Sequence, residues 1–373
     1  MRIGNILHLG VKELRSLARD PVMLLLIAWG FSGAIYAAAT VKPDTLSKAP
    51  IGIVDEDQSP LSMRITSAFY LPYFTKPTDV TQQGMDARMD SGLDTFALDI
   101  PPDFQRDVLR GRRPAIQLNV DATRMDQAYT GQGYIQTIVT TEVQAFLEHH
   151  RAKTSLPVDL DERVRFNPQL TQSWFGGVVE LINQVTILAV VLCGAALIRE
   201  REHGTVEHLL VMPVTPFEIM TAKVWANGLV VLVTCALSVM LVIHGLLRVP
   251  VQGSIALFLV GAAFHLFAST SLGIFLGTIA RSMPQFGLLF MITLMPLLIL
   301  SGGITPRESM PEAVQIVMLA APTTHFVKIA QGILYRGAGL SDVWQSFVVL
   351  FGIGAVLFGY ALARFRATIG TMV

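Results

Sequence analysis

Four consecutive residues, Leu300-Ser301-Gly302-Gly303, match the opening of a loop with which some ATPases contact bound nucleotide. They close a run, residues 286–304, that contains no charged side chain. A phosphate-binding loop of the form Gly-x-x-x-x-Gly-Lys-Ser/Thr would supply the amides and the lysine that hold phosphates. No Gly-Lys pair exists anywhere in the chain. The sequence therefore predicts that this chain has no ATPase site and that the four-residue match arose by chance.

Other reactive side chains give weak signals. Asp55, Glu56 and Asp57 could bind a cation, but no further ligand spacing supports a metal site, and a solvated turn at a strand end is favoured. Cys193 and Cys235 both lie inside apolar runs, where packing is favoured over a disulfide. No arrangement of a nucleophile and a base is visible. The sequence therefore predicts a protein that is not an enzyme and binds no cofactor or metal.

One carboxylate lies well inside an apolar run. Glu180, Asn183 and Gln184 share a face of the helix expected there. An ionisable group inside a membrane is a functional candidate, which makes these three residues candidates for a substrate pathway or gate. Glu180 lies about two turns from the end of the run, so a structural or water-exposed role is the slightly favoured alternative.

Two further features of the apolar runs favour packing. His265 lies near the middle of a run and beside Ser269, which favours an interhelical hydrogen bond over a proton relay. Gly273 and Gly277, at a spacing of four, are typical of a close crossing between two helices.

The composition indicates a polytopic membrane protein. Of 373 residues, 52% are hydrophobic and 15% are charged, and the mean hydropathy is +0.52. Soluble domains carry about 25% charged residues. A net charge of zero gives no indication of nucleic-acid binding. Six runs are long enough to span a bilayer: 22–41, 178–198, 224–247, 254–280, 286–304 and 343–363.

Lys and Arg residues in the short loops predict the orientation. With both termini in the cytoplasm, the inner segments hold ten of them and the short outer loops four. The segment 42–175 holds fourteen more, but long translocated domains are largely exempt from this rule. The first run could be a signal peptide, because Ala37-Ala38-Ala39 offers small residues for cleavage, but its length favours an uncleaved anchor.

Four segments outside the runs have distinct patterns. Residues 1–21 predict a cytoplasmic amphipathic helix. Segment 42–175 carries 14 basic and 18 acidic residues and alternates strand-like with helix-like stretches, which predicts a periplasmic α/β domain. A long helix is expected over 127–153. Segment 306–342 is interrupted at Pro322 and Gly332, which predicts a re-entrant pair of half-helices.

The segment 199–223 follows the second run on the inner side. Gly204 permits a turn, Thr205 can cap a short helix, and Pro213 would end it. Leu209 and Leu210 would give this helix an apolar face suited to a groove on a soluble partner. A loop that only returns the chain to the bilayer is the alternative that physical reasoning alone favours.

The same segment closely resembles the motif of ABC-2 type transporter permeases. The resemblance rests on a set of matched positions: Glu200, Arg201, Glu202, Gly204, Thr205, Glu207, Leu209, Leu210 and Pro213. It extends to the whole chain, with an inner N-terminal helix, one span, a large outer domain and then a domain of five spans over 176–373. Where family members often have Val-Pro-Gly at the start of the second span, this chain has Phe175-Gly176-Gly177-Val178, which leaves the expected kink in doubt.

The resemblance implies a function and partners. It implies an inner-membrane permease that moves a substrate outward, with ATP used by separate ATPase subunits that dock on the coupling loop at Glu200–Pro213. It also implies a second permease chain, identical or paralogous, while a periplasmic adaptor protein and membrane lipids are further candidate partners. A mechanical or scaffold protein that relays ATPase-driven movement to a periplasmic partner is the main alternative, and an ion-coupled carrier is less favoured.

Overall fold

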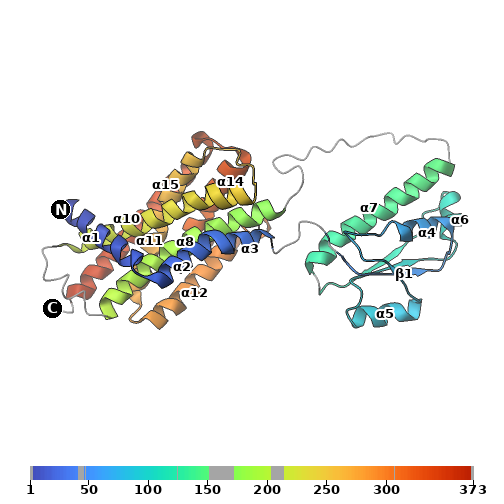
Figure 1. Cartoon of the computed structure of the whole chain (residues 1–373), viewed down its shortest axis with the longest axis horizontal. Coiled ribbons are helices and arrows are strands. Elements are labelled where there is room, and N and C mark those ends of the chain that lie inside the picture. The colour runs from blue at the N-terminus through green and yellow to red at the C-terminus, as the bar shows by residue number, and fades with distance from the viewer. Residues whose placement is uncertain are drawn as a thin grey trace. The chain divides into compact units, whose positions relative to one another are not determined.

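The computed structural model describes residues 3–40, 46, 48–123, 125–150, 172–202, 214–305 and 307–370. The chain divides into two compact units. One comprises residues 1–42 and 165–373 and is helical, and the other comprises residues 43–164 and contains a sheet. Figure 1 shows the elements of both units.

The helical unit is built from long apolar helices and a few short ones. Its elements are α1 (Ile3–Ala18), α2 (Pro21–Trp29), η1 (Gly30–Ala34), α3 (Ile35–Thr40), α8 (Gln172–Glu202), α10 (Pro216–Ser238), η2 (Val239–Leu246), α11 (Ile255–Ile279), α12 (Met283–Ile299), η3 (Arg307–Ser309), α13 (Glu312–Met318), α14 (Pro322–Arg336) and α15 (Leu340–Gly370). The segments η1 and η2 are π-helical turns that continue the helices before them, and η3 is a short 3-10 helix.

Five described helices are long and apolar enough to cross a membrane. They cover Pro21–Thr40, Trp174–Glu202, Pro216–Leu246, Ile255–Ile279 and Leu340–Ala367. The helix α12 is apolar but shorter, and α13 and α14 form a pair bent by 88°. Together with the sheet in the other unit, these helices confirm the predicted fold class, a polytopic helical membrane protein with an α/β domain.

Helices α8 and α11 contact each other, and each contacts several further helices of the unit. Apolar side chains from most helices of the unit form its main core, among them Leu181 and Val185 of α8, Leu266 of α11, Phe326 of α14 and Leu350 of α15. Cys193 and Cys235 are free and buried. Since most residues of α11 are buried, this helix is surrounded by protein along much of its length.

The structure corrects the predicted end of the fifth span. The helix α12 ends at Ile299, so Leu300-Ser301-Gly302-Gly303 lies in the bend that follows it and not within a span. Pro296 lies inside the last turn of α12, Leu300 is its C-cap, and Gly302 in the bend has a φ of 94°, a conformation that favours glycine. The sequence pattern could not locate this end, because the bend, like the helix, contains no charged residue.

Two interruptions considered from the sequence, at Gly332 and at the start of the second span, are absent from the helices in the structure. Pro322 begins α14, as its position predicted, but the helix continues through Gly332 to Arg336, so the predicted break at Gly332 is wrong. The helix α8 runs without interruption from Gln172 and shows no break at Gly176. A Cβ atom at Gly176 would lie 2.9 Å from the carbonyl oxygen of Ala38, so this glycine allows α8 and α3 to approach closely.

The second unit is an α/β domain. Its strands β1 (Ile51–Asp55), β2 (Thr78–Asp79), β3 (Phe96–Ile100) and β4 (Gln117–Val120) lie in the order β2-β1-β3-β4. The strand β1 is parallel to β2 and β3, and β4 is antiparallel to β3. Its helices are α4 (Pro60–Ser67), α5 (Gln82–Asp90), α6 (Phe104–Leu109) and α7 (Met125–His150).

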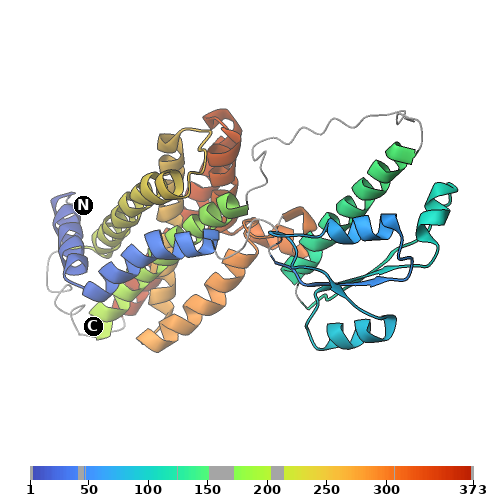
Figure 2. The ribbon, with the colours of Figure 1, turned by 45° about the vertical axis from the view of Figure 1, so that its right-hand side comes forward.

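Alternating side chains place these helices on opposite faces of the sheet (Figures 1 and 2). Ile51 and Ile53 pack with residues of α4, α6 and α7, whereas Val54 packs with Met85 of α5. The alternation of strand-like and helix-like stretches expected in this segment is therefore present, and the long helix expected over 127–153 corresponds to α7.

Candidate functional site

Residues 203–213 lie outside the described residues, and with them the predicted positions Gly204, Thr205, Glu207, Leu209, Leu210 and Pro213. The two helices that lead into and out of this segment are described. The helix α8 ends at Glu202, and α10 begins at Pro216. The side chain of Thr215 accepts a hydrogen bond from the amide of Glu218, whose carboxylate accepts one from the amide of Thr215. This capping box fixes the start of α10.

A buried lysine joins these two helices to α1. Lys223 of α10 lies with its Nζ 2.8 Å from Oε2 of Glu200 on α8 and 2.9 Å from Oε1 of Glu13 on α1. Its side chain is 2% exposed. Lys12 approaches the other oxygen of Glu200 at 3.4 Å and is mostly solvent-exposed. The cluster of Lys12, Glu13, Glu200 and Lys223, which we call the inner cluster, therefore carries two charges of each sign.

The last four residues of α8 each bind a different neighbour. Besides Glu200, the guanidinium of Arg199 donates to Asp20 at 2.7 Å, immediately before α2. Arg201 donates to the carbonyl oxygen of Ala280, at the end of α11, at 2.8 Å. A carboxylate oxygen of Glu202 accepts from the amide of Met283, the first residue of α12, at 2.9 Å. The end of α8 thus contacts the ends of α2, α11 and α12 as well as α1 and α10.

The helix α1 packs on α10 through a glycine. A Cβ atom at Gly10 would lie 2.0 Å from the indole ring of Trp225, and the indole nitrogen donates to the carbonyl oxygen of Ile6. The predicted apolar face divides between two environments, since Leu17 is buried while Ile3 is 73% exposed. The sequence predicted the amphipathic helix but not this packing, because Gly10 has no side chain to mark the contact.

Asp20 links α1 to the first span. Its carboxylate accepts hydrogen bonds from the amides of Val22 and Met23 and caps α2. The amide of Met23 and the guanidinium of Arg199 lower the pKa of this carboxyl below 3.8, against an opposing effect of burial. The charged form of Asp20 is therefore favoured in the folded protein. Its contribution to the free energy of unfolding is present above the unfolded pKa and is lost as the pH falls through the folded pKa.

We expect Asp20→Ala to lower the free energy of unfolding by about 1–2 kcal/mol at neutral pH, because it removes both the cap and the partly exposed ion pair. The difference from the unmodified chain should shrink as the pH falls below 3.8, where the native carboxyl becomes protonated. Thermal unfolding in detergent at a series of pH values measures this. A difference that grew towards acid pH would contradict the capping role.

The predicted pathway residues lie on one stretch of α8. The amide nitrogen of Gln184 donates to Oε1 of Glu180 at 2.6 Å, within the same helix. Both side chains and that of Asn183 are half-buried. Gln184 also faces α2 and η1, because a Cβ atom at Gly30 would lie 3.0 Å from its Oε1. The three residues are thus adjacent, and their contact with a substrate stays a prediction.

His265 is fully buried between α8, α11 and α14. Its Nε2 lies 2.9 Å from the hydroxyl of Thr186 and 3.1 Å from that of Ser269. Its ring stacks on Phe326 with 4.2 Å between the centroids. This hydrogen bond between α8 and α11 agrees with the favoured packing role.

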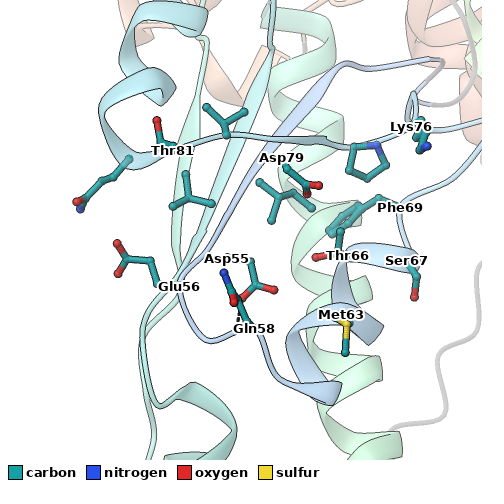
Figure 3. Close-up of a pocket in the computed structure, with 15 residues that line it drawn as sticks. Asp55, Glu56, Gln58, Met63, Thr66, Ser67, Phe69, Lys76, Asp79 and Thr81 are labelled. Atoms are coloured by element: carbon teal, nitrogen blue, oxygen red, sulfur yellow. Dashed lines mark hydrogen bonds between the residues drawn. The ribbon is translucent and has the colours of Figure 1, made fainter.

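The α/β domain contains an open cavity of about 930 Å³ beside β1, β2 and α4 (Figure 3). Asp55, at the end of β1, accepts hydrogen bonds from the amides of Asp57 and Gln58 and from the hydroxyl of Ser62. These bonds form the turn that the sequence favoured over a cation site. Within the described part of the chain, no three His, Cys, Asp or Glu residues are grouped as metal ligands would be.

Comparison with known proteins identifies the family. Residues 21–363 match the model of the ABC-2 family transporter protein. The chain is 60% identical to the inner membrane transport permease YhhJ of Escherichia coli (strain K12), over 99% of both chains. It is 28% identical to the probable multidrug ABC transporter permease YbhR of the same organism, over 95% of this chain and 96% of that protein. This chain belongs to the ABC-2 family of transporter proteins.

Proposed function

We propose that this chain is the membrane-spanning permease subunit of an ATP-driven exporter and moves its substrate outward across the cytoplasmic membrane. The observation that carries the proposal is the end of α8, where Arg199, Glu200, Arg201 and Glu202 bind five neighbouring elements. Movement of the adjacent residues 203–213 by a bound ATPase would reach the membrane helices through these contacts. The family membership supports the same role.

Energy would come from a separate subunit. The chain has no phosphate-binding loop, so ATP would be bound by ABC ATPase subunits that dock on residues 203–213. A second permease chain, identical or paralogous, would complete the pathway, with both termini in the cytoplasm. The relative YbhR is named a probable multidrug permease, and this name supports amphipathic or hydrophobic compounds as the substrate class.

Leu210→Asp is expected to release the ATPase while leaving the permease inserted in the membrane. Burial of one leucine contributes roughly 2–3 kcal/mol, which corresponds to an affinity loss of about thirty- to a hundred-and-fifty-fold. A charge placed in an apolar groove adds to this loss. Glu207→Ala should have a smaller effect, because charges at the rim of an interface mainly affect orientation and association rate.

Co-purification from native membranes measures this loss. The unmodified chain, Leu210→Asp and Glu207→Ala are compared at matched expression, and ATP-dependent export by reconstituted complexes is measured in parallel. If Leu210→Asp retains its full complement of ATPase and exports normally, residues 203–213 are only a connection and the proposal loses its coupling site. ATP binding by the purified permease alone would contradict the assignment of ATP to a separate subunit.

A further inference from the structure

The bend after α12 borders a second polar cavity, within the helical unit. The cavity has a volume of about 520 Å³ and lies between this bend, η3, α14 and the beginning of α8. Phe175, in the first turn of α8, lines it, so the cavity lies beside the N-terminal end of that helix. Ser301, Gly302 and Gly303, three residues of the four-residue match, form part of its wall.

The charged lining of this cavity is predominantly basic. Arg307, Lys328 and Arg336 line it together with a single carboxylate, that of Glu308. The lining therefore carries an excess of two positive charges. No ion pair with Lys328 or Arg336 occurs within the described part of the chain, so both cations keep their hydrogen-bonding capacity.

A buried hydroxyl points to a ligand independently of these charges. Thr324 of α14 is 3% exposed and lines the cavity, but its Oγ1 makes no hydrogen bond to any described residue. A buried polar atom without a partner is costly, and such atoms usually have one. The neighbouring threonine, Thr323, instead donates to the carbonyl oxygen of Leu297 at 3.2 Å. The Nε of Arg307 is likewise buried without a hydrogen bond to a described residue.

The bend after α12 packs against the side chain of Arg307. Gly302 has a φ of 94°, and a Cβ atom there would lie 3.2 Å from Cγ of Arg307. One nitrogen of the Arg307 guanidinium donates to the carbonyl oxygen of Gln315 at 3.4 Å, which leaves other donors available. The apolar side chains of Phe175 and Ile304, both well exposed, border the same cavity.

We infer that this cavity binds the anionic headgroup of an amphiphile, with phosphate as the representative group. Lys328, Arg336 and Arg307 would supply the positive charge, the hydroxyl of Thr324 would donate a hydrogen bond, and Phe175 and Ile304 would contact the apolar part. Charge-assisted hydrogen bonds from lysine and arginine are the usual means of holding phosphate. On the proposed topology the cavity lies at the outer surface of the membrane, and only this placement rests on the proposed function.

The test measures ligand binding to the purified full-length chain in neutral detergent, without an ATPase. Phosphatidylglycerol, phosphatidylcholine and inorganic phosphate are compared by native mass spectrometry and by thermal shift. We expect phosphatidylglycerol to bind in preference to phosphatidylcholine. In Lys328→Gln/Arg336→Gln its affinity should fall about ten- to thirty-fold, because both side chains are exposed and each such cation contributes at most about 1 kcal/mol to an ion pair. Arg281→Gln, which removes an exposed cation from the turn between α11 and α12, is the matched control and should bind normally.

Thr324→Val separates a ligand site from a merely structural feature. It keeps the shape of the side chain and removes only the hydroxyl. We expect the empty protein to be as stable as before or more stable, because the buried hydroxyl has no internal partner, while affinity for the anion falls several-fold.

The two possible sources of the anion give different results. Preferential binding of phosphatidylglycerol without stabilisation by inorganic phosphate assigns the site to a lipid-like headgroup, and stabilisation by inorganic phosphate assigns it to a free anion. Either result supports the site if Lys328→Gln/Arg336→Gln weakens the binding by the expected factor. The site is rejected if the unmodified chain neither prefers phosphatidylglycerol to phosphatidylcholine nor is stabilised by inorganic phosphate. It is also rejected if Arg281→Gln weakens binding as much as the double variant. Because no ATPase is present, a negative result leaves the exporter proposal untouched.

Discussion

Lys223→Ala should lower the free energy of unfolding of the helical unit by about 3 kcal/mol, the lower end of the range for breaking a buried ion pair. The substitution leaves the carboxylates of Glu13 and Glu200 without the cation that lies between them, 2.9 and 2.8 Å away. Both carboxylates are 13–14% exposed, so some water reaches them and the upper end of the range is not expected. The end of α8 should also lose its connection to α1 and α10.

Thermal unfolding in detergent compares this variant with two controls. Lys12→Ala removes the other lysine of the inner cluster, which is 53% exposed and 3.4 Å from Glu200, and should cost about 0–1 kcal/mol. Lys223→Met combined with Glu13→Gln and Glu200→Gln removes all three buried charges and should recover much of the loss. If Lys223→Ala unfolds at the same temperature as the unmodified chain, the ion pairs do not stabilise the fold.

Lys223→Ala also tests how movement of the ATPase would reach the membrane helices. If movement of residues 203–213 reaches the membrane through the inner cluster, Lys223→Ala should bind the ATPase normally and export poorly. Leu210→Asp should instead fail at binding. The two variants therefore distinguish a contact that attaches the ATPase from one that transmits its movement.

The inner cluster shows why part of the site could not be predicted from the sequence. Glu200 and Arg201 stood out because they belong to a recognisable motif. Lys223 was counted only as an inner positive charge, and its partner Glu13 is 210 residues away along the chain. Hydropathy could suggest that an isolated lysine at the start of an apolar helix has a partner, but it carries no information on which distant carboxylate that partner is.

The fold was predictable where local patterns determine it. Long apolar runs identified the spans, and short apolar strands bounded by turn residues identified β1, β3 and β4. The edge strand β2 was missed because it has only two residues, and α4 and α5 were missed with it. The end of α12 was misplaced because the bend after Ile299 contains no charged residue and so continues the uncharged run of the helix.

The crossing of α8 and α11 leads to the second large effect. A Cβ atom at Gly273 of α11 would lie 2.5 Å from the carbonyl oxygen of Val190 and 2.9 Å from its Cα, both backbone atoms of α8. At Gly277, one turn further, it would lie 3.2 Å from Cδ2 of Leu197 and 3.3 Å from the carbonyl oxygen of Gly194. At Gly277 the nearest atom is a side-chain end that can move and the backbone atom lies farther away, whereas at Gly273 both close contacts are with backbone and require the two helices to separate.

Gly273→Ala is therefore expected to destabilise the helical unit by about 2–3 kcal/mol, towards the upper end for an overpacked core. Separation of the helices would also weaken the hydrogen bond between Thr186 and His265, which joins the same pair. Gly228→Ala in α10 is the matched control, because a Cβ atom there meets no atom within 4 Å. This change should be neutral or stabilise the protein by up to about 1 kcal/mol through helix propensity. Thermal unfolding of both variants in the same detergent measures whether their changes in stability have opposite signs. A Gly273→Ala protein as stable as Gly228→Ala would show that α8 and α11 do not need glycine to cross.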